Sequence, residues 1–423
     1  MNELSNPDLI SWIEVKKDSD FPIQNLPFGI FKTSETAPRV ASIIGDYVID
    51  LASVNRLGYF DNFKLEQKIF NNKSLNDFIS LGKPVTNAIR KRISELLRKD
   101  NPELRDQSEH REKIFHKATE VEMLLPVEVG DYTDFYSSIE HATNVGTMFR
   151  DPENALLPNW KHIPVGYHGR SSSIIISGVD IHRPKGQSKA DDAESPTFGP
   201  CKLLDFELEM AFIIGKSTKI GDSVSTQNAE DHIFGMVLFN DWSARDIQKW
   251  EYVPLGPFLA KNFASSSSPW IVTMEALEPF KVKGPEQKPD VLPYLEYKGE
   301  KNIDINLEVL IQPENSEAHR VCSSNFKYMY WNMNQQLAHH TSNGCNIRVG
   351  DMMASGTISG STPDSFGSML EISWKGTKPI KMPDGSERRF ILDRDTVIMR
   401  GYAQKNGIRI GFGEVKTKIL PSR

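Results

Sequence analysis

From about residue 120 onward, the sequence alternates short apolar runs with loops that contain glycine and proline. Such runs occur at 173–176, 203–214, 232–240 and 305–311. Runs of this length, bounded by turn-forming residues, are typical of strands, and only short helical stretches separate them. We therefore predict a large, mostly β domain over residues 120–423, in a protein of the mainly β (α+β) class.

A smaller unit is predicted to precede it, over residues 1–119. Two runs rich in β-branched residues, 40–44 and 47–51, flank a glycine and an aspartate, which predicts a hairpin. Apolar residues recur at helical spacing over 85–96. The polar stretch 98–119 follows, and we expect the boundary between the two units there. A chain of 423 residues is long enough for two hydrophobic cores.

Charge and cysteine content exclude several classes of protein. The net charge of −6 and the pI near 6.0 provide no general attraction to nucleic acid or anionic lipid. No apolar run approaches the roughly 18 residues of a membrane span, and residues 1–16 lack the core of a signal peptide. The three cysteines are far apart and form no C-x-x-C pair, which favours a reducing compartment. We expect a soluble, cytoplasmic protein that binds neither nucleic acid nor membranes.

The run 203–214 contains two carboxylates that share one strand face. Phe206, Leu208, Met210 and Phe212 alternate with the positions of Glu207 and Glu209, so the two glutamates point to the same side. Two carboxylates in this relation repel each other unless they are solvated, protonated or bridged by a cation. Taken alone, the pair also fits an ordinary solvated strand face.

Two further carboxylates extend this pair. Asp241 follows the apolar run 233–239, at the mouth of a predicted buried strand. Asp134 lies in the aromatic and acidic stretch 130–138, where a helix cap or Asx turn is the alternative role. All four groups offer oxygen atoms alone, which suits Ca²⁺ or Mg²⁺ better than zinc. Four carboxylates leave positions for water and substrate, and the looser shell of Ca²⁺ fits this count slightly better.

A histidine follows closely. Ser137 and Glu140 have the spacing of a capping box, and Gly146 can end the short helix that they begin. His141 would then lie in or next to the first turn, where the positive helix end disfavours imidazolium. A lone histidine is usually structural, but this one lies seven residues after Asp134. We interpret it as a general base.

Several cations and one more carboxylate complete the set. Arg245 and Gln248 are one helical turn apart and can share a face. Lys261 follows a tight apolar loop that gives little reason for a charge. Beside an acidic metal cluster, these groups are plausible donors to a developing oxyanion. Glu371 lies on a predicted alternating strand, either exposed or as the partner that orients His141.

Two polar stretches, 184–200 and 281–301, are predicted to be irregular loops. They could cover an active site, but loops at the surface are the more common case.

The sequence resembles the fumarylacetoacetase family over about residues 19 to 415. The resemblance rests on stretches that occur in the same order in the family, namely 19–27, 131–138, 141–146, 154–160, 164–170, 235–257, 354–360 and 365–377. It implies a small SH3-like β-barrel N-terminal domain and a larger mixed β-roll catalytic domain of the fumarylacetoacetate hydrolase type. It also implies a homodimer that hydrolyses fumarylacetoacetate to fumarate and acetoacetate, the last step of tyrosine and phenylalanine degradation.

The resemblance also implies roles for individual residues. Asp134, Glu207, Glu209 and Asp241 would bind catalytic Ca²⁺, and a structural Mg²⁺ would contact Asp241, Lys261 and Ser265. His141 would be the base, helped by Glu371, while Arg245, Gln248 and Lys261 would stabilise the oxyanion and the leaving carbanion. The substrate would contact Tyr136, Arg150, Gln248, Tyr252 and Thr357. Ser265 stands where animal members have threonine, which keeps a hydroxyl at that site.

Three alternatives remain at this stage. Acylpyruvate hydrolases and related β-diketo acid hydrolases or decarboxylases share the acidic metal cluster. A serine or cysteine hydrolase would need an activated nucleophile, and the sequence has no G-x-S-x-G motif. A non-catalytic binding module would be favoured by loss of His141 or of a metal carboxylate, and all of these residues are present.

Overall fold

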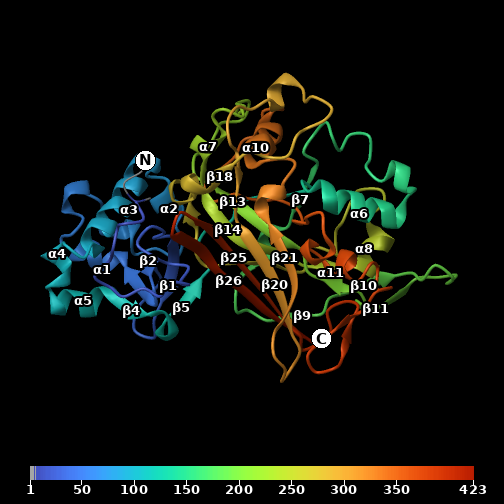
Figure 1. Ribbon diagram of the computed structural model, residues 1–423, viewed down its shortest axis with the longest axis horizontal. Coiled ribbons are helices and arrows are strands. Elements are labelled where there is room, and N and C mark those ends of the chain that lie inside the picture. The colour runs from blue at the N-terminus through green and yellow to red at the C-terminus, as the bar shows by residue number, and fades with distance from the viewer. Residues whose placement is uncertain (1–3, 5) are drawn as a thin grey trace.

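The computed structural model describes residue 4 and residues 6–423, and shows a smaller N-terminal unit beside a larger one (Figure 1). Strands form most of the larger unit, and short helices lie around them. The predicted mainly β class with additional helices is confirmed. Among the described residues, no helix has the length and apolar character needed to cross a membrane.

A five-stranded antiparallel sheet, in the order β4-β3-β2-β1-β5, forms the centre of the N-terminal unit. Its strands are β1 (Phe28–Lys32), β2 (Arg39–Ile44), β3 (Tyr47–Asp50), β4 (Phe115–Lys117) and β5 (Glu122–Leu124). The predicted hairpin is confirmed as β2–β3, with Gly45 in the left-handed conformation at φ +54° that its turn requires. The predicted helix is α3 (Lys83–Leu97), which packs its apolar side into the core of this unit. The other helices are α1 (Leu51–Arg56), α2 (Asn76–Ile79), α4 (Pro102–Arg105) and α5 (Ser108–Ile114).

The polar stretch 98–119 is not a linker, because it carries α4, α5 and strand β4. Strand β5 belongs to the same sheet and lies after residue 119. Polar residues predominate here because these elements lie at the surface and bury few side chains. The division at 119/120 stays a prediction, and a division that keeps the sheet intact would fall after Leu124.

An eight-stranded mixed sheet forms the middle of the larger unit, in the order β7-β6-β22-β13-β14-β16-β8, with β17 also paired to β14. Its strands are β6 (Tyr132–Phe135), β7 (Gly166–Gly169), β8 (Ile174–Ile176), β13 (Leu208–Ile214), β14 (Ile233–Asp241), β16 (Ser265–Ser267), β17 (Val272–Thr273) and β22 (Met352–Ala354). A five-stranded sheet has the order β21-β20-β25-β26-β9. It contains β9 (Ile181–His182), β20 (Asn306–Gln312), β21 (His319–Asn325), β25 (Thr396–Lys405) and β26 (Ile408–Leu420).

Short pairs of strands and short helices complete this unit. The pairs are β10 (Lys185–Ser188) with β11 (Thr197–Pro200), β12 (Leu204–Asp205) with β15 (Ser243–Ala244), β18 (Lys281–Val282) with β19 (Asn302–Ile303), and β23 (Ile380–Lys381) with β24 (Glu387–Arg388). The helices are α6 (Ile139–Phe149), α7 (Ala229–His232), α8 (Arg245–Glu251), α9 (Met274–Leu277), α10 (Met333–Thr341) and α11 (Met369–Ile372).

The central strands β13 and β14 are buried on both faces. Met210 and Phe212 pack into the same core as residues of the five-stranded sheet that contains β20, β25 and β26. Ala211 and Ile213, on the opposite face, pack into the core that contains the N-terminal unit. A strand buried on both faces cannot leave carboxylates in water, so any acidic side chain here must find partners inside the protein.

Two sequence predictions change in detail. The run 203–214 is not one strand, because it breaks at Phe206 and Glu207 between β12 and β13. The stretch 184–200 is not an irregular loop: its ends pair as the antiparallel hairpin β10–β11, whose strands are too short and polar to show a period-2 pattern. The stretch 281–301 is largely irregular, as predicted.

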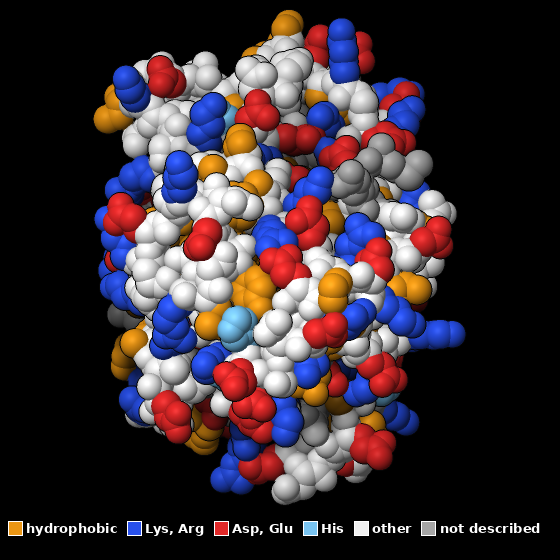
Figure 2. Space-filling model, turned by 90° about the vertical axis from the view of Figure 1, so that its left-hand side faces the viewer, with side chains coloured by type: hydrophobic (Ala, Val, Ile, Leu, Met, Phe, Trp, Pro, Cys, Tyr) orange, Lys and Arg blue, Asp and Glu red, His pale blue; other side chains and the backbone are white. Residues whose placement is uncertain are grey.

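Figure 2 shows the face on the N-terminal side of the molecule, where acidic and basic side chains are interspersed. No large area of one sign is seen on this face, in agreement with the small net charge of −6.

Candidate active site

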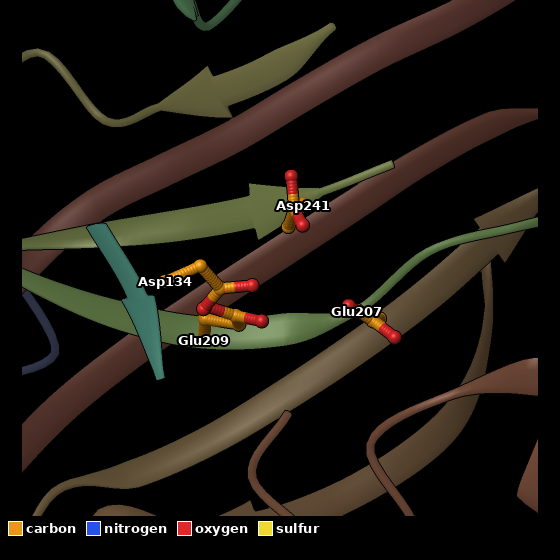
Figure 3. A group of neighbouring side chains, drawn as sticks. All are labelled: Asp134, Glu207, Glu209 and Asp241. Carbon is orange, nitrogen blue, oxygen red and sulfur yellow. The ribbon is translucent and has the colours of Figure 1, made fainter. Parts of the chain in front are cut away.

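Four carboxylates converge where strands β6, β13 and β14 lie near one another in the central sheet (Figure 3). They are Asp134 of β6, Glu207 just before β13, Glu209 in β13 and Asp241 at the end of β14. One oxygen from each lies within 4.8 Å of those of the others. Their exposed fractions are 3, 5, 0 and 1 %, so the alternative of a solvated strand face is wrong.

This group has the properties of a cation site. Asp134 Oδ1 and Glu209 Oε1 are buried and have no hydrogen-bond partner within the protein. Burial and the neighbouring carboxylates raise the pKa of both side chains well above their usual values. A buried polar atom without a partner is costly, and a hard cation bound by carboxylate oxygens removes that cost. The residues present therefore fit a divalent metal ion.

Two basic side chains neutralise part of the negative charge of this cluster. Lys261 forms ion pairs with Glu207 and, at 2.6 Å, with Asp241. Arg245 NH2 lies 2.8 Å from Glu207 Oε1. Burial alone would raise the pKa of Glu207, but Lys261 and Arg245 outweigh it and lower this pKa to about 2. The sequence-based expectation that these cations face the acidic cluster is thus confirmed in its geometry.

Two hydroxyl groups also contact Asp241. Ser265 Oγ donates to Asp241 Oδ1 at 2.7 Å, so Asp241, Lys261 and Ser265 lie together. Tyr167 Oη donates to Asp241 Oδ2 at 3.0 Å from strand β7, whose residue 167 pairs with Asp134. Tyr167 was missed in the sequence, because a four-residue strand rich in glycine carries no signal for the direction of its side chains.

His141 lies at the third position of helix α6 and is 3 % exposed. The predicted position in the first turn is confirmed, but the cap is Ser138, whose Oγ accepts from His141 N at 3.2 Å, and not Ser137. Helix α6 also continues past Gly146 to Phe149. Gly146 is required for packing rather than for ending the helix, since a Cβ there would lie 2.0 Å from the Ala155 carbonyl oxygen.

Glu371 orients the His141 ring. The distance from His141 Nδ1 to Glu371 Oε2 is 2.7 Å, and Glu371 is 1 % exposed. Asn144, Ser359 and Ser368 each donate a further hydrogen bond of 2.9 Å to the same carboxylate. Burial opposes ionisation, but His141, Asn144 and Ser368 together lower the pKa of Glu371. An ionised Glu371 accepts a hydrogen bond from Nδ1–H, so the proton of the neutral ring stays on Nδ1 and Nε2 is free to act as a proton acceptor.

The predicted strand around Glu371 is wrong, because this residue lies in helix α11 and follows its N-cap Ser368. The residues around Glu371 alternate like a strand because a helix of one turn is too short to show a helical period.

His141 and the carboxylate cluster belong to one site. His141 lies close enough to Glu207 to contribute to the lowering of its pKa. Arg245 begins helix α8 and donates to Gln248 at 3.3 Å, so these two side chains do share a face. Arg245 Nε also donates to Asp205 Oδ2 at 2.8 Å, and no local sequence pattern indicates this partner.

The four remaining residues expected to contact substrate lie in different surroundings. The ring of Tyr136 lies edge-on to His141, with centroids 5.2 Å apart, and Thr357 is buried at 2 % exposure. Arg150 is exposed and donates to the Ala155 carbonyl at 2.6 Å. Tyr252 follows helix α8 and is 51 % exposed. Contact of these residues with a substrate stays a prediction.

Comparison with known proteins gives consistent results along the chain. A family model described as Fumarylacetoacetate (FAA) hydrolase C-terminal matches residues 132–420, and one described as Fumarylacetoacetase N-terminal matches residues 24–126. The chain is 57% identical to a fumarylacetoacetase of Dictyostelium discoideum, with 98% of each chain covered. It is 54% identical to that of Homo sapiens, with 98% of this chain and 99% of the relative covered.

A relative from Arabidopsis thaliana, also named fumarylacetoacetase, is 50% identical over 98% of this chain and 99% of its own. Among solved structures, a fumarylacetoacetate hydrolase from Exiguobacterium antarcticum matches with a TM-score of 0.52 and 18% identity. This match covers 94% of this chain and 100% of that one, and it indicates a shared fold.

We predict that Asp134→Ala and Glu207→Ala lose a tightly bound divalent cation. Each change removes an oxygen ligand, so the cation affinity should fall by more than the roughly 10- to 100-fold typical of outer-shell partners. Calorimetric titration of the purified variants with Ca²⁺ and with Mg²⁺ measures this affinity. Asp50→Asn, which alters a buried acid of the N-terminal unit, is the control. Unchanged binding by Asp134→Ala would contradict the assignment.

Proposed function

The chain belongs to the fumarylacetoacetase family, and from this premise we propose that it hydrolyses fumarylacetoacetate to fumarate and acetoacetate. This reaction breaks a carbon–carbon bond and would end tyrosine and phenylalanine degradation. The observation that carries the proposal is the buried pair of His141 and Glu371 beside the carboxylate cluster. A base, a cation site and two basic side chains within one site are what hydrolysis of a 1,3-diketone requires.

The four carboxylates are proposed to hold Ca²⁺, because their oxygens leave room for water and for substrate in a large coordination shell. When bound there, a divalent cation supplies Lewis-acid polarisation of the diketone oxygens. A second, structural Mg²⁺ near Asp241, Lys261 and Ser265 is proposed on the family resemblance, and the contact of Ser265 with Asp241 is compatible with it.

His141 is proposed to start the reaction by accepting a proton from water at Nε2. The hydroxide adds to the carbonyl carbon next to the bond that breaks, and its oxygen remains in the fumarate carboxylate. Glu371 holds the ring and stabilises its protonated form through the 2.7 Å contact with Nδ1. The proton that His141 accepts balances the one that acetoacetate gains on carbon.

Arg245, Gln248 and Lys261 are proposed to stabilise negative charge in two forms. The first is the oxyanion formed when water adds, and the second is the enolate that leaves with the electron pair of the broken bond. Lys261 and Arg245 are held by Glu207, so both cations are already oriented before substrate arrives. Tyr136, Arg150, Gln248, Tyr252 and Thr357 are proposed to contact the substrate.

Three further proposals concern the whole molecule. We propose two domains, with the division near residues 119/120 or just after β5, where the first sheet ends. We propose a cytoplasmic location, which is supported by the free state of Cys201, Cys322 and Cys345.

We also propose a homodimer formed through the larger unit. Its support beyond the family is an exposed apolar segment after helix α8, where Val253, Leu255 and Phe258 are 66, 97 and 65 % exposed.

The function is tested by incubating the purified protein with fumarylacetoacetate and measuring fumarate and acetoacetate. We expect one equivalent of each product. A parallel panel of acylpyruvates and other β-diketo acids tests the related hydrolases and decarboxylases. Faster turnover of an acylpyruvate than of fumarylacetoacetate would replace the proposed substrate.

The role of His141 predicts a separation of binding from chemistry. His141→Ala should still bind the cation and a substrate analogue, while its turnover falls by roughly 10²- to 10⁴-fold. The turnover of Glu371→Gln should fall less than that of His141→Ala, since Glu371 acts only by orienting the His141 ring.

Thermal stability, cation content and turnover should be measured on the same samples. His110→Ala is the control, since His110 is a hydrogen-bonded histidine of the N-terminal unit, 2.8 Å from the Tyr59 hydroxyl. Near-normal turnover per folded molecule of His141→Ala would remove this residue from the mechanism and leave Glu371 as the candidate base.

The dimer is tested by light scattering at micromolar concentrations. We expect a particle of twice the 47.8 kDa chain mass. Leu255→Asp combined with Phe258→Asp places charge in the apolar segment and should shift the population toward the monomer. Ile220→Asp is the control, because Ile220 is 85 % exposed but lies apart from that segment in the sequence. A wild-type monomer at all concentrations would contradict the proposal.

A further inference from the structure

Asp205 is a fully buried carboxylate that contacts Arg245 of the proposed site. It lies in strand β12, and its exposed fraction is 0 %. Its oxygens accept hydrogen bonds from Arg245 Nε at 2.8 Å, from Met369 N at 2.7 Å and from Leu370 N at 3.0 Å. The first donor belongs to helix α8, and the other two belong to the start of helix α11. Asp205 thus joins two helices that are distant in the sequence.

On the side of α8, Asp205 is one of two carboxylates that bind the Arg245 guanidinium. The guanidinium lies between Asp205 and Glu207, with 2.8 Å to an oxygen of each. Glu207 belongs to the carboxylate cluster that fits a cation. In an Asp205→Asn variant, Glu207 would be the nearest carboxylate left for Arg245. The guanidinium would then turn toward the cluster and compete with the cation for Glu207.

On the side of α11, Asp205 determines where Glu371 lies. Met369 and Leu370 are the first two residues of this one-turn helix, and Glu371 is the third. Glu371 in turn orients His141 through the 2.7 Å contact with Nδ1. A helix of four residues has little stability of its own, so the two hydrogen bonds to Asp205 fix its start.

The chemistry of these contacts requires a carboxylate. Oδ1 accepts from Met369 N, while Oδ2 accepts from both Leu370 N and Arg245 Nε. All three partners are donors. An amide at this position would have to point its NH₂ group at one or two other donors, which leaves buried hydrogen-bonding groups unsatisfied.

We propose that Asp205 is a positioning residue that fixes Arg245 relative to the His141–Glu371 pair. This inference rests on the proposed function. In this proposal Asp205 acts through Arg245 and helix α11, and not by contact with the substrate. One carboxylate binds both Arg245 and the start of helix α11, which carries Glu371. A shift of Asp205 therefore changes the distance between Arg245 and Glu371. A displacement of about 1 Å in such a constellation can reduce the rate by roughly 100-fold.

The test compares Asp205→Asn with a matched control, Asp395→Asn. Asp395 is 1 % exposed and accepts from Arg388 at 2.7 and 2.8 Å and from Leu392 N at 2.9 Å. It therefore has the same kinds of partner as Asp205, but it touches none of the proposed site residues. Both variants should lose thermal stability. Asp205→Asn should lose about 10- to 100-fold in kcat per folded molecule, while Asp395→Asn should keep the wild-type kcat.

A second measurement separates positioning from a general loss of structure. If Asp205 acts partly through His141, Asp205→Asn should reduce turnover less in a His141→Ala background than in the wild-type background. Additive effects in this double-mutant cycle would overturn the link to His141. A kcat for Asp205→Asn equal to that of Asp395→Asn would overturn the proposal as a whole.

Should Asp205→Asn fail to fold, Asp205→Glu provides the same test, because it keeps the charge but moves the carboxylate by one methylene group. Reduced kcat in folded Asp205→Glu supports the proposal, and wild-type kcat contradicts it. The wild-type assay keeps the two levels apart. A wild-type protein that releases no fumarate and acetoacetate refutes the proposed function, whereas active wild type with active Asp205 variants refutes this inference alone.

Discussion

The burial of four carboxylates within 4.8 Å of one another is the constraint on which the rest of the site depends. Like charges at this distance, removed from water, repel one another strongly. Lys261 and Arg245 offset part of that repulsion through Glu207 and Asp241. Asp134 and Glu209 keep oxygens without a partner in the protein. The same imbalance of charge that would destabilise the folded chain therefore makes the cluster suited to a cation.

The sheet makes this arrangement possible by holding the carboxylates rigidly. Strands β13 and β14 are buried on both faces. The five-stranded sheet of the larger unit, which contains β25 and β26, lies on one side, and the N-terminal unit lies on the other. Asp241 N donates to the Glu207 carbonyl at 3.3 Å, so the backbone itself sets the spacing of these two side chains. The N-terminal unit contributes none of the proposed site residues. Its apolar contacts with the central strands support the sheet that carries them.

Short helices bring the remaining groups to this sheet. Helices α6, α8 and α11 carry His141, Arg245 and Glu371, and each of these residues lies in the first turn of its helix. Caps fix the first turns of α6 and α11. Ser138 Oγ accepts a hydrogen bond from His141 N, and Ser368 Oγ accepts one from Glu371 N. Fixed helix starts keep polar side chains from turning toward alternative partners, which a site with several charges requires.

The sequence by itself determined the classes of residue and the periodic elements. Alternation over 206–212 identified a strand, apolar spacing over 85–96 identified helix α3, and an all-oxygen ligand set indicated a hard cation. Only the tertiary structure decided which polar residues meet. Tyr167 and Asp205 contact Asp241 and Arg245 across 74 and 40 residues, and Glu371 reaches His141 across 230. Periodicity records which face of an element is apolar, but a hydrogen bond between distant elements leaves no local pattern. Its partners are chosen by the packing of the sheet and the short helices around it.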